Sequence, residues 1–339
     1  MASDQWGGDT GTQAVKPMVV CADDFGMAPG VNAGILELAH GGRLSAVSCM
    51  SRGRFFRLAA PSLAGLPVDK GLHLNLTERL QGDEFDEFDE RDERDERDEF
   101  ALPLRRLLWS CWSRQIDARR VVLEIERQLD AFEAVLGVAP DYVDGHQHVH
   151  QFPVIRDCLL EVLRRRYPAR LPWLRSTLPP VASTALALPQ RFKAKGIGFL
   201  GARAFTDLAS RLGFRMNAHL LGVYGFEGGE EVYARLLGDW LACAGAGDLL
   251  MCHPAGFADE GVYAGRQRVA EYAVLSGECF RSLLEEHGVV VRRLAESDRG
   301  ARGERLAILA REVDALPPQQ AADTRSDVDI LGYNERGEW

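Results

Sequence analysis

The stretch VVCADDFGMAPGVNAGILELAH, residues 19–40, contains the pattern that decides the fold of this 339-residue chain. The apolar run from Met18 to Ala22 has the length and composition of a buried strand. The run from Val31 to His40 repeats its apolar residues at helical spacing. Because a strand leads directly into a helix, the stretch predicts one β/α unit of a parallel α/β protein.

The same alternation of short apolar runs and longer amphipathic runs continues along the chain. Further strands are predicted at Leu44–Met50, Gly71–Leu76, Tyr142–His148, Trp173–Ser176, Met216–Leu221, Asp248–His253 and Val289–Leu294. The clearest helices are predicted at Arg119–Leu136, Val154–Arg166, Glu230–Ala244 and Arg266–His287. Seven or eight such units indicate parallel strands with helical crossovers, either closed as a barrel or open and doubly wound. We expect the closed (β/α) barrel.

The motifs are spread over residues 17–295, which we expect to form one domain that carries the chemistry. Residues 1–16 are expected to be a flexible N-terminus, and residues 296–339 a C-terminal tail. Residues 83–100 repeat the triplets DEF and DER. This low-complexity acidic insert has no periodic apolar face except its phenylalanines, so we expect a solvated loop or a fraying helix.

The formal net charge of −10 comes almost entirely from the acidic insert. Its twelve acidic residues and three arginines amount to −9, which leaves −1 for the rest of the chain. The body of the protein therefore has no basic field for nucleic acid or for an anionic membrane surface, and we expect neither as a partner.

The cysteine pattern is typical of reduced thiols. The seven cysteines are scattered and never form a Cys-x-x-Cys arrangement. The first residues lack the basic start and apolar run of a signal peptide, and we expect a cytoplasmic location. No run approaches the roughly 18 consecutive apolar residues of a membrane-spanning helix. The oligomeric state stays open, with a homodimer as one alternative.

Polar side chains gather where four predicted strands end, which is where parallel α/β folds place ligands and catalytic groups. Two adjacent carboxylates end the first strand, one histidine alternates with leucines, three histidines lie at the end of a further strand, and one precedes a proline. These candidate residues are Asp23, Asp24, His73, Asn75, Asp144, His146, His148, His150 and His253.

Structural interpretations compete with functional ones at these positions. One carboxylate of the Asp23–Asp24 pair could cap the following helix. A lone histidine such as His73 is more often a hydrogen-bonded core residue than a ligand. The histidines at 146, 148 and 150 would span roughly 13 Å in an extended strand, so one ion can bind one or at most two of them.

Two histidines and one carboxylate are a common metal-binding set in hydrolases, because they leave a coordination position for water. A second carboxylate and a remaining histidine would then supply a base and an acid. The candidate residues contain enough of both types for this chemistry.

Four motifs, in order, carry a resemblance to a known family: ADDFGMAPGVNAGILELAHGGRLSAVSCM, GLHLNLTE, DYVDGHQHVHQFP and CHPAGF. Together they resemble the YdjC-like carbohydrate deacetylases, the group of chitooligosaccharide deacetylase and the hopanoid-biosynthesis deacetylases. The resemblance covers about residues 17 to 295. It implies a distorted TIM-like (β/α) barrel, a divalent metal ion and an N-acetylated amino sugar as substrate. The HQHVHQFP ending favours the chitooligosaccharide branch.

The resemblance also assigns roles residue by residue. Asp24, His73 and His146 would bind the ion, Asp23 would be the general base, and His253 the general acid. The resembling family points to Mg²⁺, whereas two imidazoles suit Zn²⁺ better, so both ions stay open.

Five further residues are expected to contact the substrate or to orient the ligands: Asn75, Asp144, His148, His150 and Arg175. A metal-dependent hydrolase of another amide or ester, including a hopanoid-linked N-acetyl sugar, is the alternative. A phosphoester substrate would require cationic residues at the site. Arg175 is the candidate for that role, although it could equally pair with Asp23. A non-catalytic sugar-binding barrel would lack Asp23 or His253, and both are present.

Overall fold

The computed structural model describes residues 15–80, 100–180 and 198–295. Its strands are β1 (Lys16–Phe25), β2 (Ala46–Cys49), β3 (Asp69–Leu74), β4 (Tyr142–Gly145), β5 (Trp173–Leu174), β6 (Leu220–Leu221), β7 (Leu249–Cys252) and β8 (Val289–Val291). Its α-helices are α1 (Pro29–His40), α2 (Arg54–Ala59), α3 (Leu104–Trp112), α4 (Ala118–Leu136), α5 (Ile155–Arg166), α7 (Arg203–Arg211), α8 (Gly229–Cys243), α9 (Gly265–Ser276) and α10 (Glu278–Glu286). Shorter helical turns are η1 (Ala60–Leu63), η3 (His146–Gln151) and η5 (Gly198–Ala202). Residues 83–99 of the acidic insert, residues 1–14 and the tail at 296–339 lie outside the described ranges.

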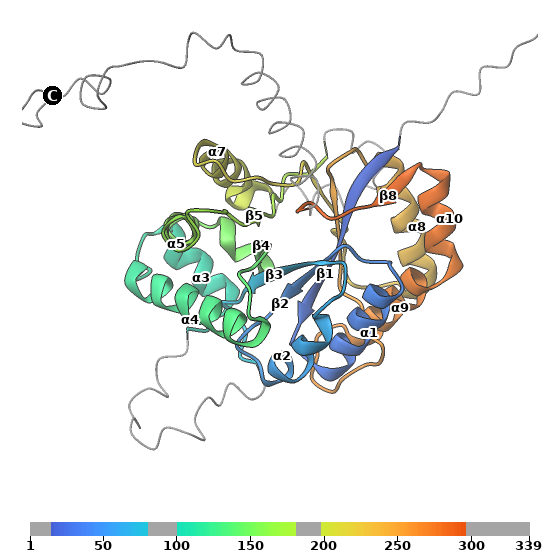
Figure 1. Ribbon diagram of the computed structural model, residues 1–339, viewed down its shortest axis with the longest axis horizontal. Helices are drawn as coiled ribbons and strands as arrows, with labels where there is room; N and C mark the ends of the chain where they lie inside the picture. The colour runs from blue at the N-terminus through green and yellow to red at the C-terminus, as the bar shows by residue number, and fades with distance from the viewer. Residues whose placement is uncertain (1–14, 81–99, 181–197, 296–339) are drawn as a thin grey trace, which may run out of the picture. The chain divides into compact units, whose positions relative to one another are not determined.

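The strands form one parallel sheet in the order β5-β4-β3-β2-β1-β7-β6, and β8 pairs with the start of β1. A bridge between Leu174 of β5 and Met216, just before β6, joins the two ends of this order. The sheet is curled, with helices around it (Figure 1). The prediction of an α/β fold that is a distorted TIM-like (β/α) barrel is therefore confirmed.

Each of the eight predicted strands overlaps an observed one, but the strand predicted at Tyr142–His148 is too long. β4 ends at Gly145, and the chain turns into η3. Gln147 and His148 have φ values of 53° and 59°, in the left-handed region that no strand can contain. The histidines at 146, 148 and 150 therefore point in different directions instead of sharing one face of a strand.

The single helix predicted at Arg266–His287 is also wrong. It is divided into α9 and α10 at Gly277, whose φ of −74° and ψ of 175° are extended and break the helical hydrogen bonding. Helix α2 was outside the prediction because its six residues are too few for a periodic pattern to emerge. Within the described ranges, no helix is both long and apolar enough to cross a membrane.

The solvated state expected for the acidic insert does not extend to Phe100. This ring is only 8% exposed and belongs to the main hydrophobic core, with the guanidinium carbon of Arg120 5.6 Å from its centroid. Two residues later, the N–H of Leu102 donates to the carbonyl of Leu76. Burial of the aromatic ring outweighs the polarity of its neighbours in sequence, so the core begins again at this residue.

Helix α1 and the loop after β7 pack closely because Gly34 of the helix has no side chain at the contact. A Cβ atom at Gly34 would lie 2.5 Å from the backbone nitrogen of Gly256, well inside van der Waals contact. Asp259 of the same loop accepts a hydrogen bond from the N–H of Gly30 at 2.9 Å, which satisfies a free donor at the start of α1. These contacts fix the position of the loop that begins at His253.

Candidate active site

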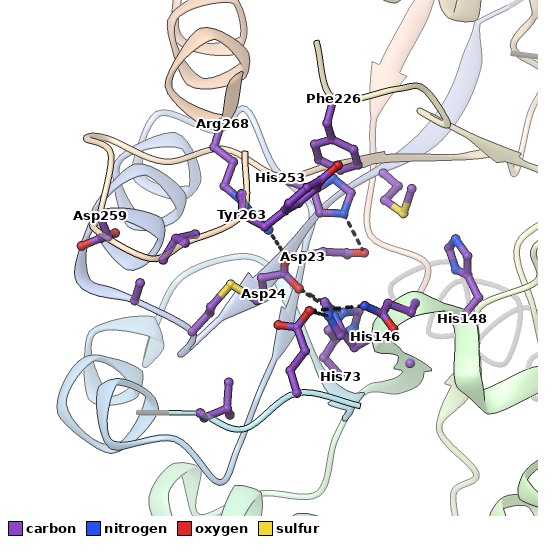
Figure 2. A pocket seen from close by; sticks show the side chains of 18 of the residues that line it. Asp23, Asp24, His73, His146, His148, Phe226, His253, Asp259, Tyr263 and Arg268 are labelled. Carbon is purple, nitrogen blue, oxygen red and sulfur yellow. Dashed lines mark hydrogen bonds and ion pairs between the residues drawn. The ribbon is translucent and has the colours of Figure 1, made fainter. Parts of the chain in front are cut away.

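A cavity of about 1200 Å³ opens at the carboxyl ends of the parallel strands (Figure 2). Its lining includes Asp23 and Asp24 from β1, His73 from β3, His146 from η3 and His253 directly after β7. These are the five residues to which the resemblance assigned metal-binding and catalytic roles. The fold therefore brings together residues that are as much as 230 positions apart in the chain, from Asp23 to His253.

Asp23 and Asp24 both face this cavity because β1 is irregular at its end. The register of β1 against β2 shifts between Ala22 and Phe25, and Asp24 has a left-handed φ of 71°. In a regular strand the two carboxylates would point to opposite faces of the sheet. Neither of them caps α1, whose N-cap is Ala28 without a side-chain hydrogen bond. The capping alternative is therefore wrong.

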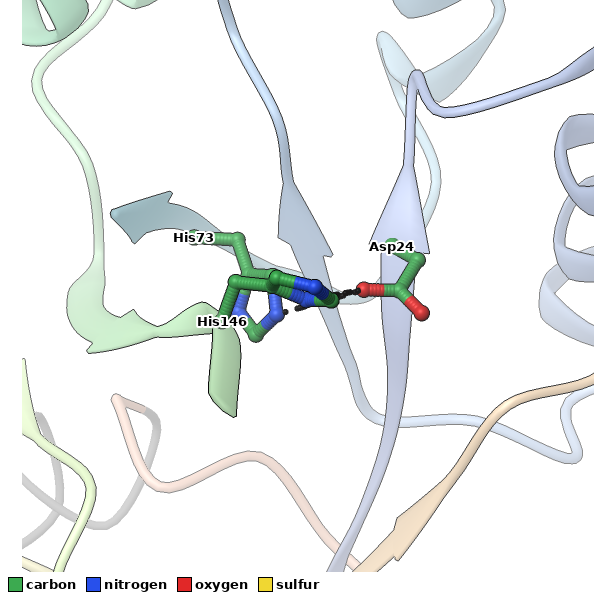
Figure 3. A group of neighbouring side chains, drawn as sticks. All are labelled: Asp24, His73 and His146. Atoms are coloured by element: carbon green, nitrogen blue, oxygen red, sulfur yellow. Dashed lines mark hydrogen bonds and ion pairs between the residues drawn. The ribbon is translucent and has the colours of Figure 1, made fainter. Parts of the chain in front are cut away.

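Asp24, His73 and His146 converge on one point (Figure 3). Oδ1 of Asp24 lies 3.0 Å from Nδ1 of His146 and 3.3 Å from Nε2 of His73. Ligand atoms around an ion with bonds of about 2.1 Å lie roughly 3.0 to 3.4 Å apart. The three side chains are buried and supply one carboxylate and two imidazoles, so both their spacing and their chemistry fit a divalent metal ion.

The second ring nitrogen of each histidine faces another carboxylate. Nδ1 of His73 lies 2.7 Å from Oδ1 of Asp144, and Nε2 of His146 lies 3.0 Å from Oε1 of Glu78. Carboxylates in this position determine which ring nitrogen carries the hydrogen. They assign Nε2 of His73 and Nδ1 of His146 to the side that faces Asp24.

Arg268 of α9 holds the third member of the cluster. Its Nη2 atom donates to Oδ2 of Asp24 at 2.6 Å, and the arginine is only 3% exposed. Since Oδ2 is engaged in this ion pair, Oδ1 is the oxygen of Asp24 that faces the two imidazoles. The cluster is thus fixed from three sides, by Asp144, Glu78 and Arg268.

Arg175 is completely buried and is not one of the residues that line the cavity. Its guanidinium makes two bonds of 2.6 Å to Asp23 and lies 2.5 Å from Oδ2 of Asp144. One charge therefore compensates two buried carboxylates. Of the two roles considered for Arg175, pairing with Asp23 is confirmed, and exposure to a substrate phosphate is wrong.

The two imidazoles of the cluster have pKa values above that of a free histidine. Burial disfavours protonation of His73, but Asp144 and Asp23 outweigh it and raise the pKa of His73 to about 10. Burial also opposes charging of His146, where Asp24 and Glu78 raise the pKa to about 9. In protein without a bound cation, both rings therefore hold an extra proton at neutral pH, which a metal ion has to displace.

Asp23 and His253 form a second, contrasting pair. Burial raises the pKa of Asp23, but the Arg175 guanidinium prevails and holds that pKa well below its usual range. Burial lowers the pKa of His253 to about 4, so this ring is neutral at neutral pH. Nε2 of His253 lies 3.9 Å from Oδ2 of Asp23. The backbone N–H of His253 donates to Glu271 at 2.6 Å.

The three histidines of the DGHQHVH motif have different surroundings. His146 belongs to the cluster, and His148 lines the cavity (Figure 2). His150 is buried away from it, donates from Nε2 to the carbonyl of Arg175 at 3.0 Å, and packs against Phe205 with ring centroids 5.1 Å apart. The expectation that one ion cannot bind all three is consistent with this arrangement.

Asn75 orients a neighbour instead of lining the main cavity. Its Oδ1 atom accepts hydrogen bonds from the N–H groups of Thr77 and Glu78 at 3.1 and 3.0 Å, and its Nδ2 donates to the carbonyl of Glu78 at 2.6 Å. These bonds shape the turn that presents the Glu78 side chain to His146.

Glu78 and Arg268 are site residues that the sequence analysis missed. Glu78 ends the GLHLNLTE motif, so its position in that motif was an available signal. Arg268 lies within the regular polar pattern of α9, and nothing in its local sequence distinguishes it from a solvated arginine. Only the packing of α9 against α1 and α8 reveals its contact with Asp24.

The curled parallel sheet, with a cluster of carboxylate and imidazole side chains at its carboxyl edge, places this chain in the class of α/β-barrel proteins. The model of the YdjC-like protein family matches residues 17–286. This chain therefore belongs to the YdjC-like family, as the four motifs indicate.

Three relatives align with most of this chain and with nearly the whole of their own sequences. The chain is 29% identical over 306 residues to the human carbohydrate deacetylase, covering 85% of this chain and 93% of the human protein. It is 30% identical over 314 residues to the mouse carbohydrate deacetylase, covering 85% and 96%. It is 25% identical over 279 residues to the chitooligosaccharide deacetylase of Yersinia pestis (strain Pestoides F), covering 80% and 96%.

One solved structure supports the fold. A crystal structure from Enterococcus faecalis V583, provisionally named for cellobiose-phosphate cleavage, superimposes with a TM-score of 0.58 at 20% identity. The match covers 84% of this chain and 99% of that one.

Proposed function

We propose that this protein is a divalent-metal-dependent deacetylase that removes N-acetyl groups from acetylated amino sugars of the chitooligosaccharide type. The observation that carries the proposal is the convergence of Asp24, His73 and His146 beside Asp23 and His253 in one cavity. The relatives named carbohydrate deacetylase and chitooligosaccharide deacetylase support a sugar substrate.

Asp24, His73 and His146 would hold the ion through Oδ1, Nε2 and Nδ1, the atoms that face one another. When bound, a divalent ion polarises the acetyl carbonyl and makes a water molecule more acidic. The two imidazoles favour Zn²⁺ or a similar transition metal over Mg²⁺, which prefers oxygen ligands. We therefore propose Zn²⁺ first and Mg²⁺ as the alternative.

Asp23 and His253 move the proton. Asp23 accepts a proton from the attacking water and passes it to Nε2 of His253, 3.9 Å away, and His253 donates it to the departing nitrogen. The order of pKa values supports this direction, because that of Asp23 lies below that of His253, and an amine lies above both. Arg175 keeps Asp23 ionised and ready to accept.

The ion pairs of Arg175 and Arg268 favour hydrolysis of an acyl carbonyl group over hydrolysis of a phosphoester. Arg175 is enclosed by Asp23 and Asp144, and Arg268 is bonded to Asp24. Their charges are therefore already compensated. Hydrolysis of another amide or of an ester remains the alternative, and a substrate panel separates it from sugar deacetylation.

The test is acetate release from N-acetylglucosamine and its oligomers by chelator-treated protein reloaded with Zn²⁺ or Mg²⁺. We expect acetate release only after reloading, and loss of both bound metal and acetate release in His73→Ala. Simple N-acetylated alkylamines and acetyl esters serve as comparison substrates. Full activity in protein shown to be free of metal, or hydrolysis of the comparison substrates alone, would contradict the proposal.

The cytoplasmic location and the oligomeric state stay predictions. All seven cysteines lie in the described ranges and are free thiols.

A further inference from the structure

Two aromatic rings stand beside the proposed proton donor, and the mechanism above makes no use of either. Phe226 lies in the loop after β6 and Tyr263 in the loop after β7, and both line the cavity (Figure 2). The Phe226 ring lies 4.8 Å from the ring of His253 and 5.9 Å from the ring of Tyr263, measured between centroids. Two loops that are far apart in sequence thus bring their aromatic side chains to one wall.

Phe226 adopts a strained backbone conformation at this wall. Its φ of 61° lies in the left-handed region, which a bulky side chain rarely occupies. The ring is held by stacking on Tyr224, with centroids 5.0 Å apart and an angle of 23° between the planes. Strain of this kind persists where packing enforces it, and it is concentrated at ligand-binding sites.

Tyr263 is 70% exposed, although it lines the cavity. A large aromatic side chain that is not covered by the protein leaves most of its ring available to a ligand. The following residue, Ala264, has a left-handed φ of 57° and is the N-cap of α9, so the loop places Tyr263 immediately before a rigid helix.

Two carboxylates in the loop that carries Tyr263 also bear on which ligand chemistry fits the cavity. Asp259 and Glu260 belong to the same loop as Tyr263 and also line the cavity, and Asp259 is anchored to the backbone of α1. Carboxylates accept hydrogen bonds from hydroxyl groups and repel anions. A ligand that combines apolar C–H faces with hydroxyl groups at its edge satisfies both the aromatic rings and the carboxylates.

We propose that Phe226 and Tyr263 form the binding platform for the pyranose ring that carries the acetylated nitrogen. The proposal rests on the function proposed above. In a deacetylation the sugar is on the side of the leaving nitrogen, and His253 protonates that nitrogen. The sugar ring therefore lies next to His253, where the two aromatic side chains are. A neutral pyranose with equatorial substituents exposes C–H bonds on its faces and fits this wall, whereas an acyclic amide lacks such a face.

The test uses the metal-loaded enzyme and the dimer of N-acetylglucosamine as the probe. Because Tyr263 is largely exposed, Tyr263→Ala is expected to fold normally. We expect it to raise KM about tenfold, the value of one aromatic contact, with a much smaller change in kcat. Tyr263→Phe keeps the ring and should restore KM. Phe257→Ala is the matched control, since Phe257 is 51% exposed in the same loop and lies outside the described cavity lining.

A second readout separates this proposal from the proposed function. Saturation-transfer NMR reports binding of the same dimer without any turnover. If the wild type releases acetate and Tyr263→Ala has an unchanged KM, the platform is refuted while the function stands. If the dimer binds in a Tyr263-dependent way without acetate release, the platform stands and the function fails. Absence of both binding and acetate release in the wild type refutes both.

Discussion

The imidazole of His73 is bonded through Nδ1 to Oδ1 of Asp144 at 2.7 Å and presents Nε2 to Asp24 at 3.3 Å. His146 has the equivalent relationship with Glu78, but the two carboxylates differ in how deeply they are buried. Asp144 is fully buried and is held by Arg175 and by a hydrogen bond from Ser48 at 2.7 Å. The Glu78 side chain is 40% exposed. One histidine is thus oriented by the rigid interior and the other by a surface turn.

This difference predicts unequal effects of removing the two carboxylate charges. Asp144→Asn should weaken Zn²⁺ binding by roughly 10- to 100-fold, because it loosens the orientation of His73 and also leaves Arg175 with one partner fewer. Glu78→Gln should have a smaller effect, since water can replace an exposed partner. Competition with a chromophoric chelator measures both affinities. Asp130→Asn, on the exposed side of α4, is the control. Equal losses in the two site variants would contradict the assignment.

Metal binding should become stronger as pH rises. In chelator-treated protein, His73 and His146 have pKa values of about 10 and about 9, so each must lose a proton to bind an ion at neutral pH. The affinity should therefore rise from pH 6 toward about pH 9 and level off near pH 10. Calorimetry in buffers of different ionisation enthalpy counts the protons, and we expect about two per ion at pH 7. Binding without proton release would rule out these two ligands.

The proposed proton path predicts that its two members retain metal but lose turnover. Asp23→Asn and His253→Ala should each keep bound metal and release acetate roughly 10² to 10⁴-fold more slowly. The His253→Ala defect should shrink with an activated acetyl ester, whose leaving group needs no proton. Elemental analysis and acetate release are measured on the same samples. Loss of metal in Asp23→Asn, or near-normal amide hydrolysis in His253→Ala, would show that the roles are assigned wrongly.

The close approach of α1 to the loop of His253 predicts that Gly34→Ala is damaging. The new Cβ atom would meet the backbone of Gly256 at 2.5 Å, and backbone cannot rotate away as a side chain can. We expect a loss of about 1 to 3 kcal/mol in the free energy of unfolding, with reduced activity because the loop is displaced. Gly41→Ala is the matched control at the end of α1, where the nearest atom would lie 3.4 Å away. Chemical denaturation measures both, and similar stabilities would contradict the packing argument.

The sequence was sufficient for the order of β/α units and for the candidate residues at strand ends. Both depend on local patterns: a short apolar run, an amphipathic run, and polar residues where the apolar run stops. The strand predicted at Tyr142–His148 is too long at its end, because the left-handed turn at Gln147 and His148 has no such pattern. The prediction that Phe100 is solvated is wrong because the burial of this ring depends on contacts with residues distant in sequence.

By itself, the sequence determined the α/β class, the family and most of the candidate site residues, but not Glu78 or Arg268. The tertiary structure decided how that set is divided: His146 in the cluster, His148 at the cavity and His150 behind Arg175. It also supplied Arg268 as the partner of Asp24. The physical reason is that strand and helix patterns arise from neighbours in the chain. A buried charge, by contrast, is stabilised by whichever side chain the fold brings within hydrogen-bonding distance.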